Sequence, residues 1–483
     1  MNNLTRTKII ATVGPGTATE EKITALIEAG ANVIRINSSH ENEQAHKERI
    51  EIVRKVSEKL CKYTAIMLDL QGPKIRVGTL ETPIFLEKGT QVKIKPSDTT
   101  DGSFIPVDYK GILNDVKKGE RLLLDDGKLE LKVVSVNTSE IVAKVIHGGF
   151  LKSRKGLNIP GCTTSVSAIT ERDIEYIKFA ADNDVDYIAL SFVRNREDIL
   201  IAKHHIENTG KNIPLIAKIE KPQALDNIEE IIDISDAIMV ARGDLGIEIS
   251  PERVPIVQKQ IIASANKKSK PVIVATQMLE SMIEQPIPTR AETSDVANAV
   301  MDGADAVMLS GETAVGEFFV EAVAMMKAIA QNVEESKLMT LNKRITAPQC
   351  LSQEKDAYAI VRAIVDMVEE VEVGAIVAFT KTGYTARLLS KAKPSVPVIA
   401  ISNHVHTCRR LSLYWGINAV YMNIEKGLNE KLMKRLDAMF IEESLVSFKD
   451  KVIITGSMPY LATGSTTNFI RLHEVGSYAE TEV

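Results

Sequence analysis

PLIAKIE (214–220) and AIMVARGD (237–244) are short apolar runs that end in charged residues, and they show the repeating unit of this 483-residue chain. Six further runs of the same kind are TKIIATVG (7–14), NVIRIN (32–37), TAIMLDL (64–70), DYIALSFV (186–193), PVIVATQM (271–278) and AVMLSG (306–311). Longer amphipathic segments separate most of them, as in βα units around a parallel sheet. Eight units favour a closed (β/α)₈ TIM barrel over a doubly wound open sheet.

The gap between the third and fourth runs, residues 71–185, is too long for one crossover. Within it, QVKIK, RLLLDDGKLELKVVSV and EIVAKVIHGG alternate apolar and polar residues around DDG and HGG turns. This pattern predicts a small antiparallel β-barrel domain inserted at 73–166. The catalytic barrel is then expected to comprise residues 1–72 and 167–340.

A second α/β region follows a helix expected near 317–337 and a break at LNKRITAPQ. It contains a helical pattern at 354–370 and the strand-like runs AIVAFT, VPVIAIS, INAVYM, KVIITGS and NFIRLHEV. We therefore expect a separate C-terminal α/β domain with an open sheet at 345–483.

The bulk composition excludes some function classes. The formal net charge is −5 and no dense Lys/Arg block occurs, which argues against nucleic-acid binding. The N-terminus, MNNLTRTKIIATVG, lacks the apolar core of a signal peptide, and no apolar stretch reaches the ~18 residues of a membrane span. We expect a cytoplasmic protein with no membrane partner.

Charged residues at the ends of the fifth and sixth runs suggest a metal site. Lys218 and Glu220 are two residues apart in an expected strand, so they point to the same side. Asp244 ends the next run, and neighbouring strands lie about 4.8 Å apart. Glu220 and Asp244 can therefore share a divalent ion, and oxygen ligands suit Mg²⁺ or Mn²⁺. The alternative is a structural ion pair between Lys218 and Glu220.

Other strand ends add cations and hydroxyls. Arg35, Asn37 and Ser39 alternate at the second run, and an arginine offers a planar fork for phosphate oxygens. Arg35 could instead be a structural bridge to the neighbouring strand. Thr276 lies at the end of the seventh run, and a bond from its hydroxyl to its own backbone is the simpler interpretation. Together these groups fit phosphoryl transfer, and the absence of a Walker A sequence argues against a P-loop mechanism.

At these residues the sequence resembles the pyruvate kinases. The matching segments are ATVGP, IRINSSH, DLQGPKIR, KGLNIPG, LSFVRN, AKIE, MVARGDLG, ATQMLESM, PTRAETSDVANAVMDGADAVMLSGETA (288–314) and TGSTTN. The resemblance covers the chain from Thr7 to about Gly476. It implies transfer of the phosphoryl group of phosphoenolpyruvate to ADP, giving pyruvate and ATP, in an enzyme that is usually a homotetramer.

The resemblance also implies roles for single residues. Glu220 and Asp244 match the family's Mg²⁺ ligands, Lys218 the lysine that stabilises the moving phosphoryl group, and Arg35 the arginine that binds the phosphate. Thr276 matches the region that protonates the enolate. The remaining matches are a substrate contact, Gly243, and the nucleotide contacts Arg76 and Lys155, with Asn37 and His40 nearby. The inserted domain matches a lid that closes over the nucleotide and excludes water.

Two departures bear on monovalent cations and the lid hinge. Potassium-dependent members carry Thr, Lys and Glu where this chain has Leu70, Gln71 and Lys74, with Asn37, Ser39 and Asp69 as the other expected residues of that site. A lysine ammonium at Lys74 can replace the charge of K⁺, so activity without K⁺ is expected.

After KGLNIPG, Ser165 stands in place of a hinge aspartate, which puts a metal role there in doubt.

The C-terminal segment AFTKTGYTARLLSKAKP resembles the family's effector-phosphate loop, with Thr380, Lys381, Thr382 and Thr385 as candidate contacts. Ordinary N-capping by these threonines is the alternative. GSMPYLATGSTTN has no Lys, Arg or Trp to clamp a second phosphate. The expected effector is therefore a sugar monophosphate or a nucleotide, or there is none.

Two other function classes stay open at this point. A barrel lyase or aldolase could use the same carboxylates and an enolate, but it would not need the insert. A catalytically inactive phosphometabolite sensor could use the C-terminal domain, although the set of Lys218, Glu220, Asp244 and Arg35 argues against it.

Overall fold

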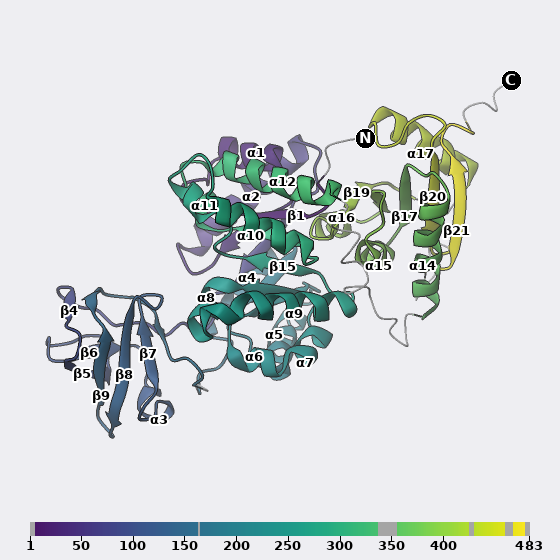
Figure 1. Ribbon diagram of the computed structural model, residues 1–483. Helices are drawn as coiled ribbons and strands as arrows, with labels where there is room; N and C mark the ends of the chain where they lie inside the picture. Colours follow the sequence, from purple (N-terminus) through teal and green to yellow (C-terminus); the bar gives the residue numbers. More distant parts are fainter. Residues whose placement is uncertain (1–4, 163–164, 337–354, 425–428, 459–466, 479–483) are drawn as a thin grey trace.

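The computed structural model describes residues 5–162, 165–336, 355–424, 429–458 and 467–478, so the break predicted at LNKRITAPQ lies outside the described residues. A central barrel lies between an inserted β domain and a C-terminal α/β domain (Figure 1). Within the described residues, no helix is long and apolar enough to cross a membrane.

The predicted eight-stranded barrel is confirmed. Its strands pair in parallel in a closed ring, β1-β2-β3-β12-β13-β14-β15-β16. They are β1 (Lys8–Val13), β2 (Val33–Asn37), β3 (Ala65–Asp69), β12 (Tyr187–Leu190), β13 (Leu215–Ile219), β14 (Ala237–Ala241), β15 (Val272–Ala275) and β16 (Ala306–Leu309). The open-sheet alternative is therefore wrong.

Helices surround the ring because each buries an apolar face against the outer side of the strands. They are α1 (Glu20–Ala29), α2 (Glu43–Lys59), α4 (Glu171–Asp182), α5 (Arg196–Glu207), α6 (Pro222–Asp226), α7 (Ile228–Ile234), α9 (Val254–Lys267), α10 (Arg290–Met301) and α12 (Phe319–Glu335). Shorter helical segments follow the strand ends: α8 (Arg242–Glu248), η1 (Pro251–Arg253), η2 (Glu280–Ile283) and α11 (Gly311–Ala314).

The barrel interior is apolar in its middle and polar at one end. Met67, Ala189 and Ile216 belong to a buried cluster inside the ring. Successive inward-facing residues on a strand are two apart, so Asp69, Ser191 and Lys218 form the next layer towards the carboxyl ends. The strand alternation therefore places charged side chains at the rim where barrel enzymes build their sites.

The insert between β3 and β12 is a small β domain with its own buried core. It comprises β4 (Ile84–Leu86), β5 (Gln91–Pro96), β6 (Ile105–Val107), α3 (Ile112–Asp115), β7 (Arg121–Leu124), β8 (Leu129–Val136), β9 (Ile141–His147), β10 (Gly149–Leu151) and β11 (Leu157–Asn158). Its main sheet has the order β11-β7-β8-β9-β5-β6, and β10 pairs with β4 in a separate two-stranded sheet.

The pairing in the main sheet is antiparallel as expected, except that β5 and β6 are parallel. The three-residue strand β6 is too short to show a period-two pattern in the sequence. Isolated bridges from Arg76 to Gly156 and from Val77 to Val107 join the two edges of the sheet.

The C-terminal domain has the sheet order β19-β18-β17-β20-β21, with only β21 antiparallel. Its elements are α14 (Lys355–Glu370), β17 (Ala375–Phe379), α15 (Tyr384–Ala392), β18 (Val398–Ser402), α16 (Val405–Leu411), β19 (Ile417–Tyr421), α17 (Glu430–Glu442), β20 (Lys451–Gly456) and β21 (Phe469–Glu474). All five expected strands are present.

This domain covers the amino-terminal end of the barrel. Leu413 is fully buried within the barrel-interior cluster, and Tyr187 Oη donates to the carbonyl of Arg410 at 2.6 Å. Lys391 forms a fully buried ion pair with Asp305, which directly precedes β16. Because this end is closed, the polar rim at the opposite end is the one open to a substrate.

Candidate active site

Four charged side chains form a continuous network at the carboxyl ends of β2, β3 and β13. Arg35 Nε lies 2.7 Å from Asp69 Oδ2, and Lys218 Nζ lies 3.1 Å from Asp69 Oδ1. Lys218 Nζ also lies 2.9 Å from Glu220 Oε1. The bridge from Arg35 to the neighbouring strand and the ion pair between Lys218 and Glu220, both considered as structural alternatives, are thus present. Arg35 and Lys218 also share one buried carboxylate, that of Asp69.

Burial and charge fix the protonation of this network. Burial alone would lower the pKa of Lys218, but Asp69 and Glu220 outweigh it and raise that pKa above its ordinary value. Burial would raise the pKa of Asp69, but the charges of Lys218 and Arg35 lower it. Lys218 is therefore a permanent cation at neutral pH, and Asp69 is a permanent anion between two cations.

Glu220 is the carboxylate best suited to a metal. It is 1% exposed, and burial raises its pKa although Lys218 opposes the shift. The charge of Asp244 raises the pKa of both Glu220 and Lys218, so this carboxylate lies within electrostatic range of the pair. Glu220 directly follows β13, and Asp244 lies in the first turn of α8, which follows the neighbouring strand β14.

The donor set fits a hard divalent cation that takes further oxygens from its substrate. Mg²⁺ in phosphoryl-transfer sites binds one or two carboxylates and keeps water and phosphate oxygens as its other ligands. Among the described residues, no three His, Cys, Asp or Glu side chains gather closely enough to hold a metal by themselves. Glu220 and Asp244 are the carboxylates of this site that could hold such a cation together with water and other oxygen ligands.

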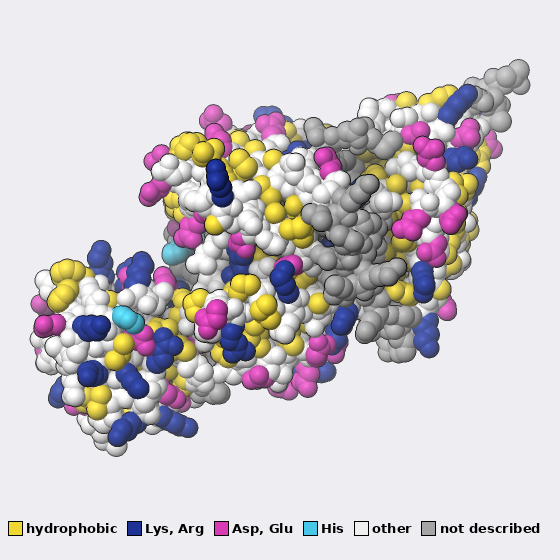
Figure 2. Space-filling model, viewed as in Figure 1, with side chains coloured by type: hydrophobic (Ala, Val, Ile, Leu, Met, Phe, Trp, Pro, Cys, Tyr) yellow, Lys and Arg dark blue, Asp and Glu magenta, His cyan; other side chains and the backbone are white. Residues whose placement is uncertain are grey.

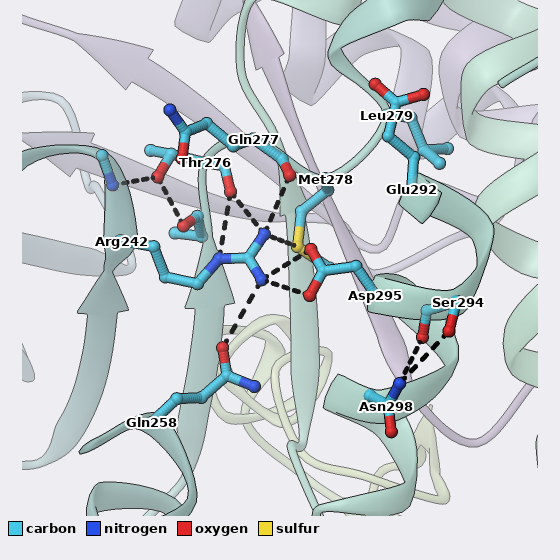
Figure 3. Close-up of polar contacts among 12 residues, drawn as sticks. Arg242, Gln258, Thr276, Gln277, Met278, Leu279, Glu292, Ser294, Asp295 and Asn298 are labelled. Carbon is cyan, nitrogen blue, oxygen red and sulfur yellow. Dashed lines mark hydrogen bonds and ion pairs between the residues drawn. The ribbon is translucent and has the colours of Figure 1, made fainter. Parts of the chain in front are cut away.

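Thr276 directly follows β15, and Gly243 lies in the first turn of α8, after the neighbouring strand β14. Gly243 N–H donates to Thr276 Oγ1 at 2.8 Å, and Thr276 Oγ1 donates to the carbonyl of Ala275 at 2.6 Å (Figure 3). The hydroxyl is thus bonded to the local backbone, although to the carbonyl of the preceding residue and not to its own. The bond from Gly243, in the first turn of α8, joins Thr276 to the segment that carries Asp244.

Residues expected at the nucleotide lie partly on the barrel and partly on the insert. In the inserted domain, Arg76 Nη1 donates to the carbonyl of Arg154 at 3.3 Å, and Lys155 Nζ lies 2.7 Å from Asp125 Oδ1. On the barrel, Asn37 Oδ1 accepts the Ser39 N–H at 3.0 Å, and His40 is exposed. Lys and Arg side chains gather on the inserted domain (Figure 2).

The residues expected at a monovalent-cation site are not joined in one cluster by the contacts of this structure. Asp69 pairs with Arg35 and Lys218, and the buried Leu70 accepts the Ser191 hydroxyl through its carbonyl at 2.7 Å. The Lys74 side chain lies against Gly156 of the insert: a Cβ added to Gly156 would be 3.2 Å from Lys74 Cε.

The hinge serine is bonded to the insert. Ser165 N–H donates to Asp115 Oδ2 at 2.8 Å, and its hydroxyl lies 2.9 Å from Tyr109 Oη. Ser165 thus joins the returning chain to the end of α3, a contact that the sequence did not predict.

The candidate effector loop precedes α15. Thr380 Oγ1 accepts the Gly383 N–H at 2.9 Å, and Thr385 Oγ1 lies 2.8 Å from Thr467 Oγ1. Lys381 and Thr382 are exposed. No side chain caps the first turn of α15 within the described part of the chain, so capping by these threonines is not observed there. The facing loop at 459–466 lies outside the described residues.

Sequence reasoning missed three residues that contact the network. Ser191 Oγ accepts from Lys218 Nζ at 2.7 Å, and Thr12 Oγ1 accepts from Arg35 Nη1 at 3.1 Å. The backbone N–H of Phe192 donates to Glu220 Oε2 at 2.8 Å. Strand alternation could have found Ser191 because it lies two residues after Ala189 of the interior cluster.

Comparisons with known proteins assign this site to a family. Residues 4–323 match the family model "Pyruvate kinase, barrel domain", and residues 358–473 match "Pyruvate kinase, alpha/beta domain". The pyruvate kinases of Staphylococcus aureus (strain MRSA252) and Staphylococcus saprophyticus are 42% and 43% identical over 98% of this chain and 80% of their own. A crystal structure of a pyruvate kinase from Cryptosporidium parvum superposes with a TM-score of 0.90 at 35% identity, covering 97% of this chain and 96% of that one. The chain therefore belongs to the pyruvate kinase family, the enzymes that convert phosphoenolpyruvate and ADP to pyruvate and ATP.

Proposed function

We propose that phosphoryl transfer takes place at the network around Lys218. The observation that supports it best is a buried ammonium between Asp69 and Glu220, with the Arg35 guanidinium on the same Asp69 carboxylate. Arg35 and Lys218 bind the phosphate of phosphoenolpyruvate. As the phosphoryl group moves, its equatorial oxygens meet these two fixed charges, whose orientation is already set in the free enzyme.

Glu220 and Asp244 would hold the Mg²⁺ or Mn²⁺ ion. When bound, the ion neutralises phosphate charge and orients the substrate carboxylate. Lys218 stays paired with Glu220 and keeps this carboxylate turned towards the substrate. The backbone at Gly243 binds the substrate, and Thr276 lies where a proton is delivered to the enolate carbon.

The inserted domain acts as the lid. Asn37 and His40 on the barrel rim and Arg76 and Lys155 on the insert bind the nucleotide phosphates from opposite sides. Attraction between the basic insert and the anionic nucleotide favours closure, and closure excludes the water that would otherwise hydrolyse the phosphoryl group. We further propose that the enzyme is a cytoplasmic homotetramer.

The test of this function is a coupled pyruvate assay with phosphoenolpyruvate and ADP, with and without divalent metal and K⁺. We expect turnover that needs the divalent metal and proceeds without K⁺, because Lys74 supplies the positive charge near Asn37, Ser39 and Asp69 once the lid closes. A Lys74→Glu variant should become dependent on K⁺. A rise of orders of magnitude on adding KCl to the unchanged enzyme, at constant ionic strength, would overturn K⁺ independence.

We also propose that an effector phosphate binds at the start of α15. Backbone N–H groups at a helix N-terminus and the side chains of Thr380, Lys381, Thr382 and Thr385 suit one phosphate. A sugar monophosphate or nucleoside monophosphate is therefore expected to lower the half-saturating phosphoenolpyruvate concentration, and Thr382→Ala should weaken this effect. Strong activation by fructose 1,6-bisphosphate alone would contradict the proposal.

A further inference from the structure

The turn that carries Thr276 has an uncommon backbone. Thr276 and the next residue, Gln277, both adopt positive φ values, 69° and 53°. A left-handed β-branched residue is a genuine outlier, and it persists only where the surrounding structure holds it. Some neighbouring group must therefore stabilise this turn between β15 and η2.

The Arg242 guanidinium is that group. Its Nε and Nη2 donate to the Thr276 carbonyl at 3.2 and 2.7 Å, and Nη2 also donates to the Gln277 carbonyl at 2.9 Å. Both left-handed residues thus have their carbonyl oxygens on one arginine, at the centre of Figure 3. The planar fork of an arginine can make these bonds at once, whereas the single ammonium of a lysine cannot reproduce their geometry.

Two further elements fix the other side of the guanidinium. Nη1 lies 2.6 Å from Asp295 Oδ2 on α10 and donates to Gln258 Oε1 on α9 at 3.5 Å. Arg242 is 7% exposed, so the bonded carboxylate compensates a charge that is otherwise costly to bury. Asp295 and Gln258 thus bind one side of the guanidinium, and the other side binds the carbonyl oxygens of the Thr276 turn.

Arg242 also begins the helix that lines the site. It is the first residue of α8, and the next residue, Gly243, donates its N–H to Thr276 Oγ1 at 2.8 Å. Asp244, the proposed metal ligand, is the following residue. One buried side chain therefore links the backbone of Thr276 to the backbone that presents Gly243 and Asp244.

We propose that Arg242 is a positioning residue for protonation of the enolate: it fixes the hydroxyl of Thr276 at the start of α8. This inference rests on the proposed function and extends it to a residue that touches no substrate. In the step concerned, the enolate electron pair forms a C–H bond at the methylene carbon, and the C–O bond becomes a carbonyl. The Thr276 hydroxyl turns from the Ala275 carbonyl, gives its proton to that carbon and takes one from a water molecule, and the hydroxide that remains is neutralised by the solvent.

The test compares Arg242→Lys, Thr276→Ala and the double variant by two readouts. The first is kcat and KM for phosphoenolpyruvate. The second is deuterium uptake into the pyruvate methyl group in D₂O with Mg²⁺ and inorganic phosphate. Because small misplacements at a reacting centre can cost up to ~10²-fold, we expect Arg242→Lys to lower kcat and exchange ~10- to 100-fold. KM should change much less.

If Arg242 acts through Thr276, its effect should largely disappear in the Thr276→Ala background, so the two losses should not multiply. Losses that multiply, or wild-type exchange in Arg242→Lys, would overturn the inference. Failure of the unchanged enzyme to convert phosphoenolpyruvate and ADP would instead overturn the proposed function.

Arg54→Lys is the matched control. Arg54 also donates to two carbonyl oxygens and a buried carboxylate, those of Thr64 at 3.2 Å, Asp184 at 2.7 Å and Asp186 at 2.8 Å, but at the other end of the barrel. It should lower thermal stability without changing exchange. If Arg242→Lys does not fold, Asp295→Asn is used instead, because it leaves Arg242 in place. It should lower the rate of deuterium exchange several-fold, and this loss should disappear in the Thr276→Ala background. Full exchange in Asp295→Asn would then refute the proposal.

Discussion

Replacing Lys218 by methionine is expected to lower kcat for phosphoryl transfer by ~10³-fold or more, since loss of one preorganised charge-stabilising group costs about 10²–10³ in other enzymes. Lys218 contributes a full charge and contacts Asp69, Ser191 and Glu220. Methionine matches the lysine side chain as far as Cε and removes only the ammonium, so the barrel interior stays largely filled. The ion pair between Arg35 and Asp69 and the hydrogen bond from the Phe192 N–H to Glu220 are unchanged by this substitution.

The measurement is the coupled pyruvate assay, together with circular dichroism to show that the variant is folded. Lys270→Met is the control: this lysine is partly buried and donates to the carbonyl of Ser235 at 2.6 Å, but it precedes β15 at the closed end of the barrel. It should retain its activity. Deuterium exchange into pyruvate should fall less than phosphoryl transfer in Lys218→Met, because the proton is delivered beside Thr276. Full phosphoryl transfer in Lys218→Met would refute the role of this lysine.

Most of the fold could be predicted from the sequence because buried parallel strands are continuous apolar runs of residues. Runs such as AIMVA in β14 are buried at every position, and each is separated from the next by helices with one apolar face. The parallel pairing of β5 with β6 could not be predicted in this way. It depends on a strand of three residues and on the route of the chain between them, neither of which has a periodic pattern.

Part of the charged core was predictable for a simple geometric reason. Lys218 and Glu220 are two residues apart at the end of one strand, so they share a face. The position of Asp69 between Lys218 and Arg35 was not predicted, because it depends on side chains from three different strands. The contacts of Arg242 were not predictable, because they join a helix start to a turn 34 residues later through two left-handed residues. No local propensity predicts positive φ at a threonine; the tertiary bonds impose it.

Replacing Glu220 by glutamine is expected to lower kcat ~10²-fold and to raise the Mg²⁺ concentration needed for half-maximal activity at least ~10-fold, in line with the 10- to 100-fold losses seen when groups that support a metal are changed. The amide keeps the size of the side chain and can still accept the Phe192 N–H. It removes one negative charge beside Asp244, whose charge raises the pKa of Glu220. Asp244→Asn should have an effect of the same kind.

Binding of Mn²⁺ measured by electron paramagnetic resonance in the presence of phosphoenolpyruvate separates loss of the metal from loss of the fold. Asp186→Asn is the control, because Asp186 is also buried and pairs with an arginine, Arg54, at 2.8 Å, but lies at the closed end of the barrel. It should destabilise the protein and leave Mn²⁺ affinity unchanged. Glu220→Gln could instead bind Mn²⁺ as tightly as the unchanged enzyme. Glu220 would then serve only as the ion-pair partner of Lys218, and the metal ligands would have to be Asp244 and substrate oxygens.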